Sequence, residues 1–261
     1  MSQKNKNISY FIGKNMGPAR SFMELVNKSS SADYYAFSDQ DDVWDSKKII
    51  SAIEKLEKIE KPCLYISALE IVDENLNTIE IKKVKGNFTF EGEIIKNFAN
   101  GCTQVFNKQL CDIVKMYNPQ YLIMHDSWIT RICYAIGGDV IIDDNAYIKY
   151  RQHGNNQVGV EKISHGFKKL DQVRNLFIDV KLGLFETYVN NDRIFNEKLK
   201  KENIEALQYF QMIKDKKNFN FKNWKVFHEL YKNETFSYYI INFLIMNLPG
   251  IGRILFKIRY M

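Results

Sequence analysis

One stretch decides the fold: Tyr34-Tyr35-Ala36-Phe37-Ser38-Asp39-Gln40-Asp41-Asp42-Val43-Trp44. Its first four residues form an apolar run, and turn-forming polar residues follow, which is typical of a short buried strand. The three carboxylates therefore come at the carboxyl end of a strand, and in open α/β sheets that edge is where ligands bind. The stretch predicts an α/β protein with an acidic site at one edge of its sheet.

The acidic residues of this stretch predict a particular kind of ligand. Three carboxylates in four positions repel one another and raise each other's pKa values unless a cation is present. Mg²⁺ and Mn²⁺ prefer carboxylate oxygens and commonly bridge to phosphates. We interpret Asp39, Asp41 and Asp42 as an Asp-x-Asp site for a divalent cation and a nucleotide diphosphate. The alternative is an acidic turn that caps the next helix, with Asp45 or Ser46 as the N-cap.

Composition excludes several classes of protein. A chain of 261 residues with 45% hydrophobic and 14% aromatic residues can bury a real core and is not disordered. The net charge of +6 suits phosphate-bearing ligands or an anionic membrane face. No basic stripe with interleaved aromatic residues accompanies that charge, so we expect no nucleic-acid partner.

The cysteines and the apolar segments indicate a cytoplasmic protein. The four cysteines have no metal-finger or redox spacing, so we expect buried free thiols in a reducing compartment. The polar segment 1–7 is not a signal peptide, and no stretch reaches the roughly 20 apolar residues of a membrane span. We expect a cytoplasmic location, peripheral on the inner face of the cell membrane.

Strand and helix patterns alternate in the first part of the chain. Apolar runs at 8–12, 34–37 and 63–67 read as strands, and helical spacing of apolar residues separates them. This order predicts a sheet with parallel strand pairs. Two more strands are expected at 139–143 and 147–150. A polar loop with His153 follows the last one, which makes His153 a candidate metal ligand or phosphate contact.

A second informative stretch is His125-Asp126-Ser127-Trp128. We expect a helix from about Ser127 to Ile136, ended by two glycines. Asp126 would then be the N-cap of that helix. An aspartate at a helix start that faces a pocket can also act as a general base, and the two roles are compatible.

Beyond about residue 160 the pattern becomes helical. We divide the chain into an α/β domain over residues 1–159 and a helical C-terminal region over residues 160–261. The apolar segment 236–248 is followed by a basic one, so residues 236–259 fit a helix on an anionic membrane surface. A helix packed on the core or on a partner subunit accounts for the same pattern.

Five separated motifs occur in one order and resemble a known family. They are Asn15-Met16-Gly17-Pro18-Ala19-Arg20-Ser21-Phe22, Asp33 to Trp44, Asn100-Gly101-Cys102-Thr103, His125 to Trp128, and Tyr150 to Asn156. Together they resemble the family-two glycosyltransferases of the GT-A fold, a Rossmann-like, mostly parallel α/β fold, and especially the bacterial rhamnosyltransferase-like branch. The resemblance covers roughly residues 8 to 160.

The resemblance implies roles for the acidic motif and its surroundings. Asp39 would contact the nucleoside side of the donor, and Asp42 would shape the donor-sugar pocket. Asp41 would bind the divalent metal, Mg²⁺ or Mn²⁺, that neutralises the leaving diphosphate, and His153 would complete that site. Asp126 would be the general base that deprotonates the acceptor hydroxyl.

Other positions would contact the substrates through the same resemblance. The substrate-binding positions that it adds are Gly17, Arg20, Trp44, Gly101, Cys102 and Trp128. Gly17 and Arg20 match a donor-proximal turn, and Gly101 and Cys102 match the turn beneath the acceptor site. The reaction implied is an inverting transfer of a sugar, with rhamnose from dTDP-rhamnose as the best choice, to a polysaccharide or lipid-linked acceptor.

The chain departs from the family pattern at its start. Family members open with a strand carrying a Pro-x-Tyr-Asn-like segment and a second strand ending in Asp-Asp-Gly-Ser, and neither occurs here. We therefore expect an N-terminally truncated fold that lacks two strand–helix units and binds donor poorly by itself. An upstream partner chain would complete it. The alternative function is an inactive fragment or an accessory subunit of a split glycosyltransferase, acting by partner binding.

Overall fold

The computed structural model describes residues 7–152, except residues 87, 96, 118, 120, 121 and 123, together with His228. The predicted helical region 160–261, its membrane-surface helix 236–259 and His153 lie outside the described residues, apart from His228. None of the described helices is both long enough and apolar enough to cross a membrane.

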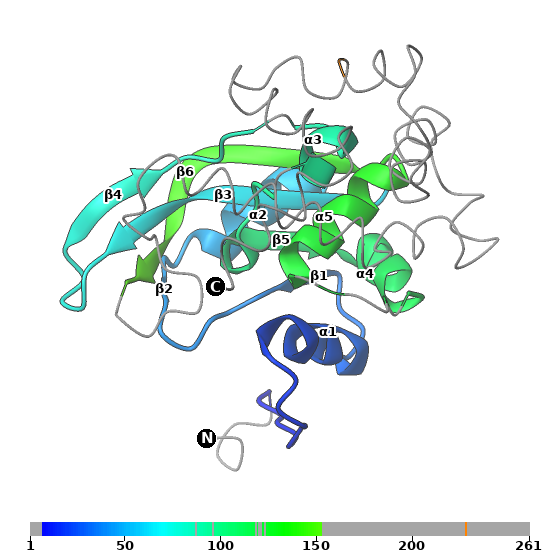
Figure 1. Cartoon of the computed structure of the whole chain (residues 1–261), viewed down its shortest axis with the longest axis horizontal. Helices are drawn as coiled ribbons and strands as arrows, with labels where there is room; N and C mark the ends of the chain where they lie inside the picture. The colour runs from blue at the N-terminus through cyan, green and yellow to red at the C-terminus, as the bar shows by residue number, and fades with distance from the viewer. Residues whose placement is uncertain are drawn as a thin grey trace, which may run out of the picture.

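The described part of the chain contains both helices and strands (Figure 1). In order, the elements are α1 Pro18–Lys28, β1 Tyr34–Ala36, β2 Val43–Trp44, α2 Lys48–Leu56, β3 Cys63–Val72, β4 Thr78–Lys82, α3 Phe90–Ile95, the 3₁₀ turn η1 Gly101–Thr103, β5 Gln104–Asn107, α4 Lys108–Lys115, α5 His125–Ala135 and β6 Asp139–Arg151. The strands form one sheet in the order β1-β5-β3-β6-β2, and β4 pairs with β3 outside that path.

The structure contains helices packed on a sheet, which confirms the prediction of an α/β fold. The sheet is mixed, however, and the prediction of a mostly parallel sheet is wrong. Among the described strands, β3 and β6 pair in parallel, whereas β1 with β5, β5 with β3, β3 with β4 and β2 with β6 are antiparallel. The strand expected at residues 8–12 has no regular structure, and its apolar side chains are exposed, with Ile12 at 94%. Without burial or pairing, an alternating pattern does not make a strand.

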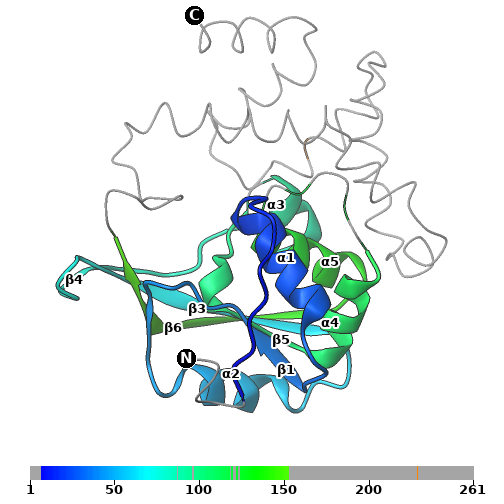
Figure 2. The same cartoon turned by 90° about the horizontal axis from the view of Figure 1, so that it is seen from below.

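Helices cover both faces of the sheet. In Figure 2 α1, α3, α4 and α5 lie on one face and α2 lies on the other. The central strand β3 is buried along nearly its whole length, which explains its continuous apolar run, Cys63-Leu64-Tyr65-Ile66. The two strands expected at 139–143 and 147–150 are one long strand, β6, whose register with β3 shifts near Ser67 and Ala68.

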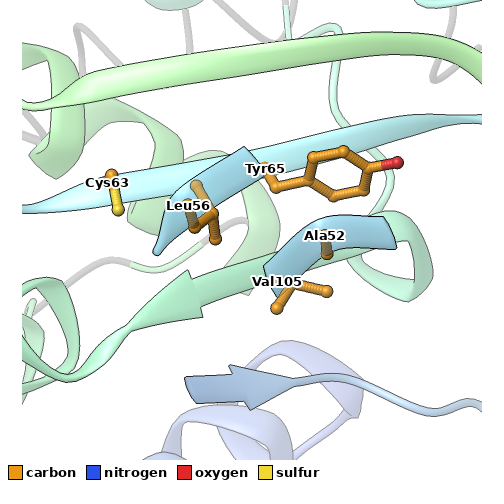
Figure 3. Packing of buried hydrophobic residues seen from close by; sticks show 5 residues of the cluster. All are labelled: Ala52, Leu56, Cys63, Tyr65 and Val105. Carbon is orange, nitrogen blue, oxygen red and sulfur yellow. The ribbon is translucent and has the colours of Figure 1, made fainter. Parts of the chain in front are cut away.

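The core under α2 is a compact cluster (Figure 3). Ala52 and Leu56 of α2 pack on Cys63 and Tyr65 of β3 and on Val105 of β5, and all five are buried. The four cysteines of the chain are buried and free, as their spacing predicted. This cluster fixes α2, and therefore the turn that precedes it, against the sheet.

Both helix ends that bear on the site follow from local sequence. Pro18 opens α1, as expected, directly after Gly17, whose φ of 79° favours glycine. Helix α5 ends just before Gly137, which has a φ of 76°. Helix α5 begins at His125, so Asp126 lies in its first turn, and the prediction that Asp126 is the N-cap is wrong.

Candidate functional site

The acidic stretch and the turn η1 meet at one edge of the sheet. Because β1 and β5 are antiparallel, with Ala36 opposite Val105, the carboxyl end of β1 and the amino end of β5 share that edge. The chain leaves β1 into the acidic stretch, and η1 leads directly into β5. One ligand atom each from Asp39, Asp42 and Cys102 lies within 4.8 Å of the other two. The acidic stretch follows β1 at an edge of the sheet, as the sequence predicted, and its role as a metal site stays a prediction.

Asp42 is the member of the cluster most changed by its surroundings. Burial, followed by the charge of Asp39, raises the pKa of Asp42 to about 6, while hydrogen bonds from Arg151 and Cys102 oppose the rise. Its Oδ2 is buried and has no hydrogen-bond partner among the described residues. Burial and the charge of Asp41 also raise the pKa of Asp39. Carboxylates that are half-buried, close together and incompletely paired fit a divalent cation.

Arg151 fastens the acidic stretch to the end of β6. Its backbone N–H donates to Asp42 Oδ1 at 3.3 Å, and its Nε donates to the carbonyl oxygen of Asp41 at 3.2 Å. Its Nη1 donates to the carbonyl oxygen of Glu74 at 2.6 Å. The side chain of Asp41 does not belong to the three-residue cluster, so its predicted role as a metal ligand stays a prediction.

Lys48 and Trp44 complete this half of the site, and sequence analysis missed the lysine. The Lys48 side chain is buried, and its Nζ lies 3.4 Å from the centre of the Trp44 ring. Burial lowers the pKa of Lys48 to about 8, against the opposing influence of Cys102, Asp42 and Asp39. The sequence offered one signal for Lys48: a lysine stands at the start of the helix that follows the acidic stretch.

The alternative prediction, that Asp45 or Ser46 is the N-cap of the next helix, is wrong, although Asp45 does form a turn before α2. The carboxylate of Asp45 accepts a hydrogen bond from the Lys47 backbone N–H at 2.7 Å, in the turn before α2. The N-cap position itself is Lys47, rather than Asp45 or Ser46. Asp45 therefore forms the turn before α2, and neither Asp39 nor Asp42 is the N-cap of that helix.

Asp126 forms the second half of the site, next to the acidic cluster. Its Oδ2 accepts the backbone N–H of Gly101 at 3.1 Å, and its Oδ1 accepts Ser127 N–H at 2.6 Å and Asn97 Nδ2 at 3.3 Å. Burial raises the pKa of Asp126 to about 6, although these hydrogen bonds oppose the rise. A carboxyl group with a pKa in this range is suited to accept a proton near neutral pH.

A buried polar network supports Asp126 from α3 and α5. Glu93 is fully buried, accepts Ser127 Oγ at 2.8 Å and lies 3.7 Å from Arg131 Nε. Burial raises the pKa of Glu93 to about 8, and the charge of Arg131 opposes the rise. Sequence analysis missed Glu93 because nothing in the local pattern marks it as buried.

Gly101 is required by the close approach of His125. A methyl group at Gly101 would lie 2.4 Å from Nε2 of His125. The His125 ring stacks on Phe22 with ring centres 4.3 Å apart, and burial lowers its pKa to about 4, so the imidazole is neutral. The glycine therefore lets η1 lie against α5.

The turn η1 joins the two halves. Gly101 donates its backbone N–H to Asp126, and the next residue, Cys102, belongs to the acidic cluster. Cys102 also packs on Leu69, Ile71 and Ile148. Gly101 and Cys102 lie in a turn before a strand, as expected. That this turn lies beneath the acceptor site and contacts substrate stays a prediction.

The remaining predicted residues lie around this edge. Trp44 lies in β2. Together with Tyr150, it packs against the apolar cluster formed by Leu69, Ile71, Cys102 and Ile148. Trp128 is buried in α5, close in sequence to Asp126. Gly17 and Arg20 lie at the start of α1, which packs against α4 and α5. Their roles in substrate binding stay predictions.

The structure thus defines an α/β protein in which the turn η1 links an acidic cluster that could hold a cation to the buried carboxylate of Asp126. Comparison with known proteins adds one distant relative. The chain is 26% identical over 204 residues to a protein of Shigella flexneri named dTDP-rhamnosyl transferase RfbG, a match that covers 75% of this chain and 70% of that protein. No family model matches the chain. The similarity indicates a distant relation to a glycosyltransferase.

Proposed function

We propose that this protein is a glycosyltransferase that moves a sugar from a nucleotide-sugar donor to a polysaccharide or lipid-linked acceptor. The observation that carries the proposal is that η1 links the two halves of the site: Gly101 hydrogen-bonds to Asp126, and its neighbour Cys102 belongs to the cluster with Asp39 and Asp42. The similarity to a dTDP-rhamnosyl transferase supports rhamnose, from dTDP-rhamnose, as the sugar. The fold by itself does not imply the activity, because one fold serves many functions.

The two halves of the site divide the work of an inverting transfer. Such a reaction needs a base for the acceptor hydroxyl and positive charge for the leaving diphosphate, on opposite sides of the sugar carbon. Asp39 and Asp42 would hold a divalent cation, Mg²⁺ or Mn²⁺, whose charge would stabilise the diphosphate. In the predicted set, Asp41 and His153 would contribute further ligands.

Asp126 would take the proton from the acceptor hydroxyl. Its carboxylate already accepts three hydrogen bonds, and the longest of them comes from Asn97, whose side chain lies near the surface. We infer that the acceptor hydroxyl replaces Asn97 at Oδ1, while Gly101 and Ser127 keep the carboxylate in place. Glu93 positions Ser127 by accepting a hydrogen bond from the Ser127 hydroxyl group.

A deletion in the source cell tests this function in the presence of any partner chain. We expect the surface polysaccharide to lose one sugar, rhamnose, when the gene is removed, and wild-type chain to restore it. Asp126→Asn should fail to restore it, although the variant accumulates to the same level. Unchanged polysaccharide after deletion would overturn the proposal. Restoration by Asp126→Asn would favour the accessory, non-catalytic function.

A further inference from the structure

Lys48 presents an unusual combination of burial and lack of hydrogen bonds. Its residue is 1% exposed, and its Nζ has no hydrogen-bond partner among the described residues. The Trp44 ring, 3.4 Å away, fixes the ammonium group by a cation–π contact. A buried ammonium with three unused donors is costly to maintain. A ligand that accepts hydrogen bonds from this ammonium group would offset the free-energy cost of burying it.

The Trp44 ring that contacts the ammonium packs against the apolar cluster that contains Cys102, so Lys48 lies beside the acidic cluster. The groups that act electrostatically on its ammonium are the carboxylates of Asp39 and Asp42 and the thiol of Cys102. A divalent cation that enters the cluster alone is repelled by the ammonium group. A diphosphate that enters alone is repelled by the two carboxylates. When both enter together, each repulsion is offset by an attraction.

We propose that Lys48 makes this site bind a divalent cation and a diphosphate as a pair. Its ammonium weakens the binding of the cation by itself and donates hydrogen bonds to the diphosphate oxygens. Trp44 is the positioning residue that keeps the ammonium in place. The inference deepens the proposed function and rests on it, because it assigns a charge-coupling role to a residue of the donor half.

The test measures binding of Mn²⁺ and of inorganic pyrophosphate, without any transfer assay. Mn²⁺ binding to the full chain is followed by electron paramagnetic resonance, and pyrophosphate retention in the presence of Mn²⁺ is followed by equilibrium dialysis. Lys48→Met should bind Mn²⁺ alone more tightly by about fivefold to a hundredfold, a typical size for coupling between two ligands. The same variant should retain less pyrophosphate. These opposite changes are not expected from general damage to the fold.

Two further variants make the result decisive. Lys47→Met removes the same charge from an exposed neighbour and should behave as wild type, and Lys48→Arg should keep the wild-type pattern. Unchanged or weaker Mn²⁺ binding by Lys48→Met overturns the inference, as does an equal effect of Lys47→Met. Circular dichroism shows whether Lys48→Met folds. If it does not, the test rests on Lys48→Arg: a folded Lys48→Arg chain that loses the wild-type Mn²⁺ binding and pyrophosphate retention overturns the inference.

The same titrations separate this inference from the proposed function. If Mn²⁺ binds the wild type and is lost in the double variant Asp39→Asn, Asp42→Asn, the cation site stands and only the role of Lys48 is in question. If Mn²⁺ binds neither the wild type nor Lys48→Met, both the cation site and the inference fall. Binding to Lys48→Met alone supports the inference most strongly, because the ammonium then masks the site.

Discussion

At Asp126, a single oxygen-to-nitrogen change separates binding from chemistry. Asp126→Asn keeps the shape of the side chain and can still accept the Gly101 N–H bond, but it cannot take a proton. We expect donor binding to stay within about twofold of wild type and sugar transfer to fall by at least about a hundredfold, the usual size of a general-base contribution. Titration calorimetry and transfer in cell lysate measure the two quantities. Full turnover in the variant would show that the base is another residue.

The pKa of Asp126 also predicts how activity depends on pH. Because burial raises this pKa to about 6, the carboxylate is mostly protonated below pH 6 and mostly ionised above it. A base acts only when ionised, so the transfer rate should rise with pH through about 6 and then level off. A pH–rate profile with saturating donor checks this expectation. A rate that increases as pH falls below 6 would contradict the assignment.

Asp42 predicts a pH dependence of stability with a definite sign. Folding raises its pKa from 3.8 to about 6, so the protonated form is favoured in the folded chain. Its stabilising contribution is therefore present below pH 4 and lost as pH rises through about 6. Asp42→Asn should melt at a higher temperature than wild type above pH 6, without metal, and should differ less near pH 4. The opposite sign in thermal melts would show that Asp42 is well paired.

Sequence reasoning singled out acids at the ends of elements and missed Lys48 and Glu93, two other charged side chains that fold into the interior. Asp39, Asp42 and Asp126 were predicted because acids that follow a strand or open a helix are visible in the pattern. Lys48 and Glu93 were missed because an isolated lysine or glutamate is normally exposed. Only the fold shows that both are buried, because it places Lys48 against the Trp44 ring and Glu93 beside Arg131.

At the scale of elements, the packing of η1 on α5 depends on Gly101. A methyl group there would meet Nε2 of His125 at 2.4 Å, and that ring is fixed between Phe22 and Phe37. Gly101→Ala should therefore lower the free energy of unfolding by about 1–3 kcal/mol, as overpacked positions do. Urea denaturation measures the change.

A second glycine supplies the control for this prediction. At Gly13 a methyl group would meet the flexible end of Glu24 at 3.1 Å and the Phe11 ring at an ordinary 3.7 Å, so Gly13→Ala should change stability little. Equal stability of Gly101→Ala and wild type would mean that η1 can move away from α5 at no cost. In that case Gly101 would not fix the distance between the two halves of the site.

The errors at this scale come from contacts between elements. The helix starts at Pro18 and the stop at Gly137 were predictable, because they depend on one residue's backbone preference. The strand expected at 8–12 was wrong, since strand formation requires a partner that local alternation cannot supply. The split of β6 into two strands was wrong for a related reason: its pairing with β3 continues through the shifted register near Ala68.

At the scale of the whole molecule, a buried hydrogen bond ties the parallel pair β3 and β6 together. Tyr65 Oη donates to Asp143 Oδ2 at 2.7 Å, and Lys55 of α2 lies 3.5 Å from the same oxygen. Tyr65→Phe should cost about 2 kcal/mol of unfolding free energy, because a buried bond to a charged group is lost. Tyr10→Phe, at an exposed tyrosine, is the control and should cost nothing measurable. Equal unfolding curves for the two variants would contradict the role of this bond.

The class of the fold could be predicted from sequence, but the order of its strands could not. Buried apolar runs such as Cys63 to Ile66 identify the central strand, and helical spacing identifies the layers around it. Strand order and direction depend on pairings between segments far apart, such as Ala36 with Val105, which leave no local trace. The predicted absence of N-terminal strands and the predicted partner chain stay predictions.

In the function that we propose, the Asp39–Asp42 cluster binds a nucleotide-sugar through a divalent cation. The most direct measurement is a titration of the full chain with several nucleotide-sugars, including dTDP-rhamnose, with and without Mn²⁺. We expect weak binding of one donor that requires Mn²⁺ and disappears in the double variant Asp39→Asn, Asp42→Asn. Binding of no donor, or binding that is equally strong without Mn²⁺, would contradict it.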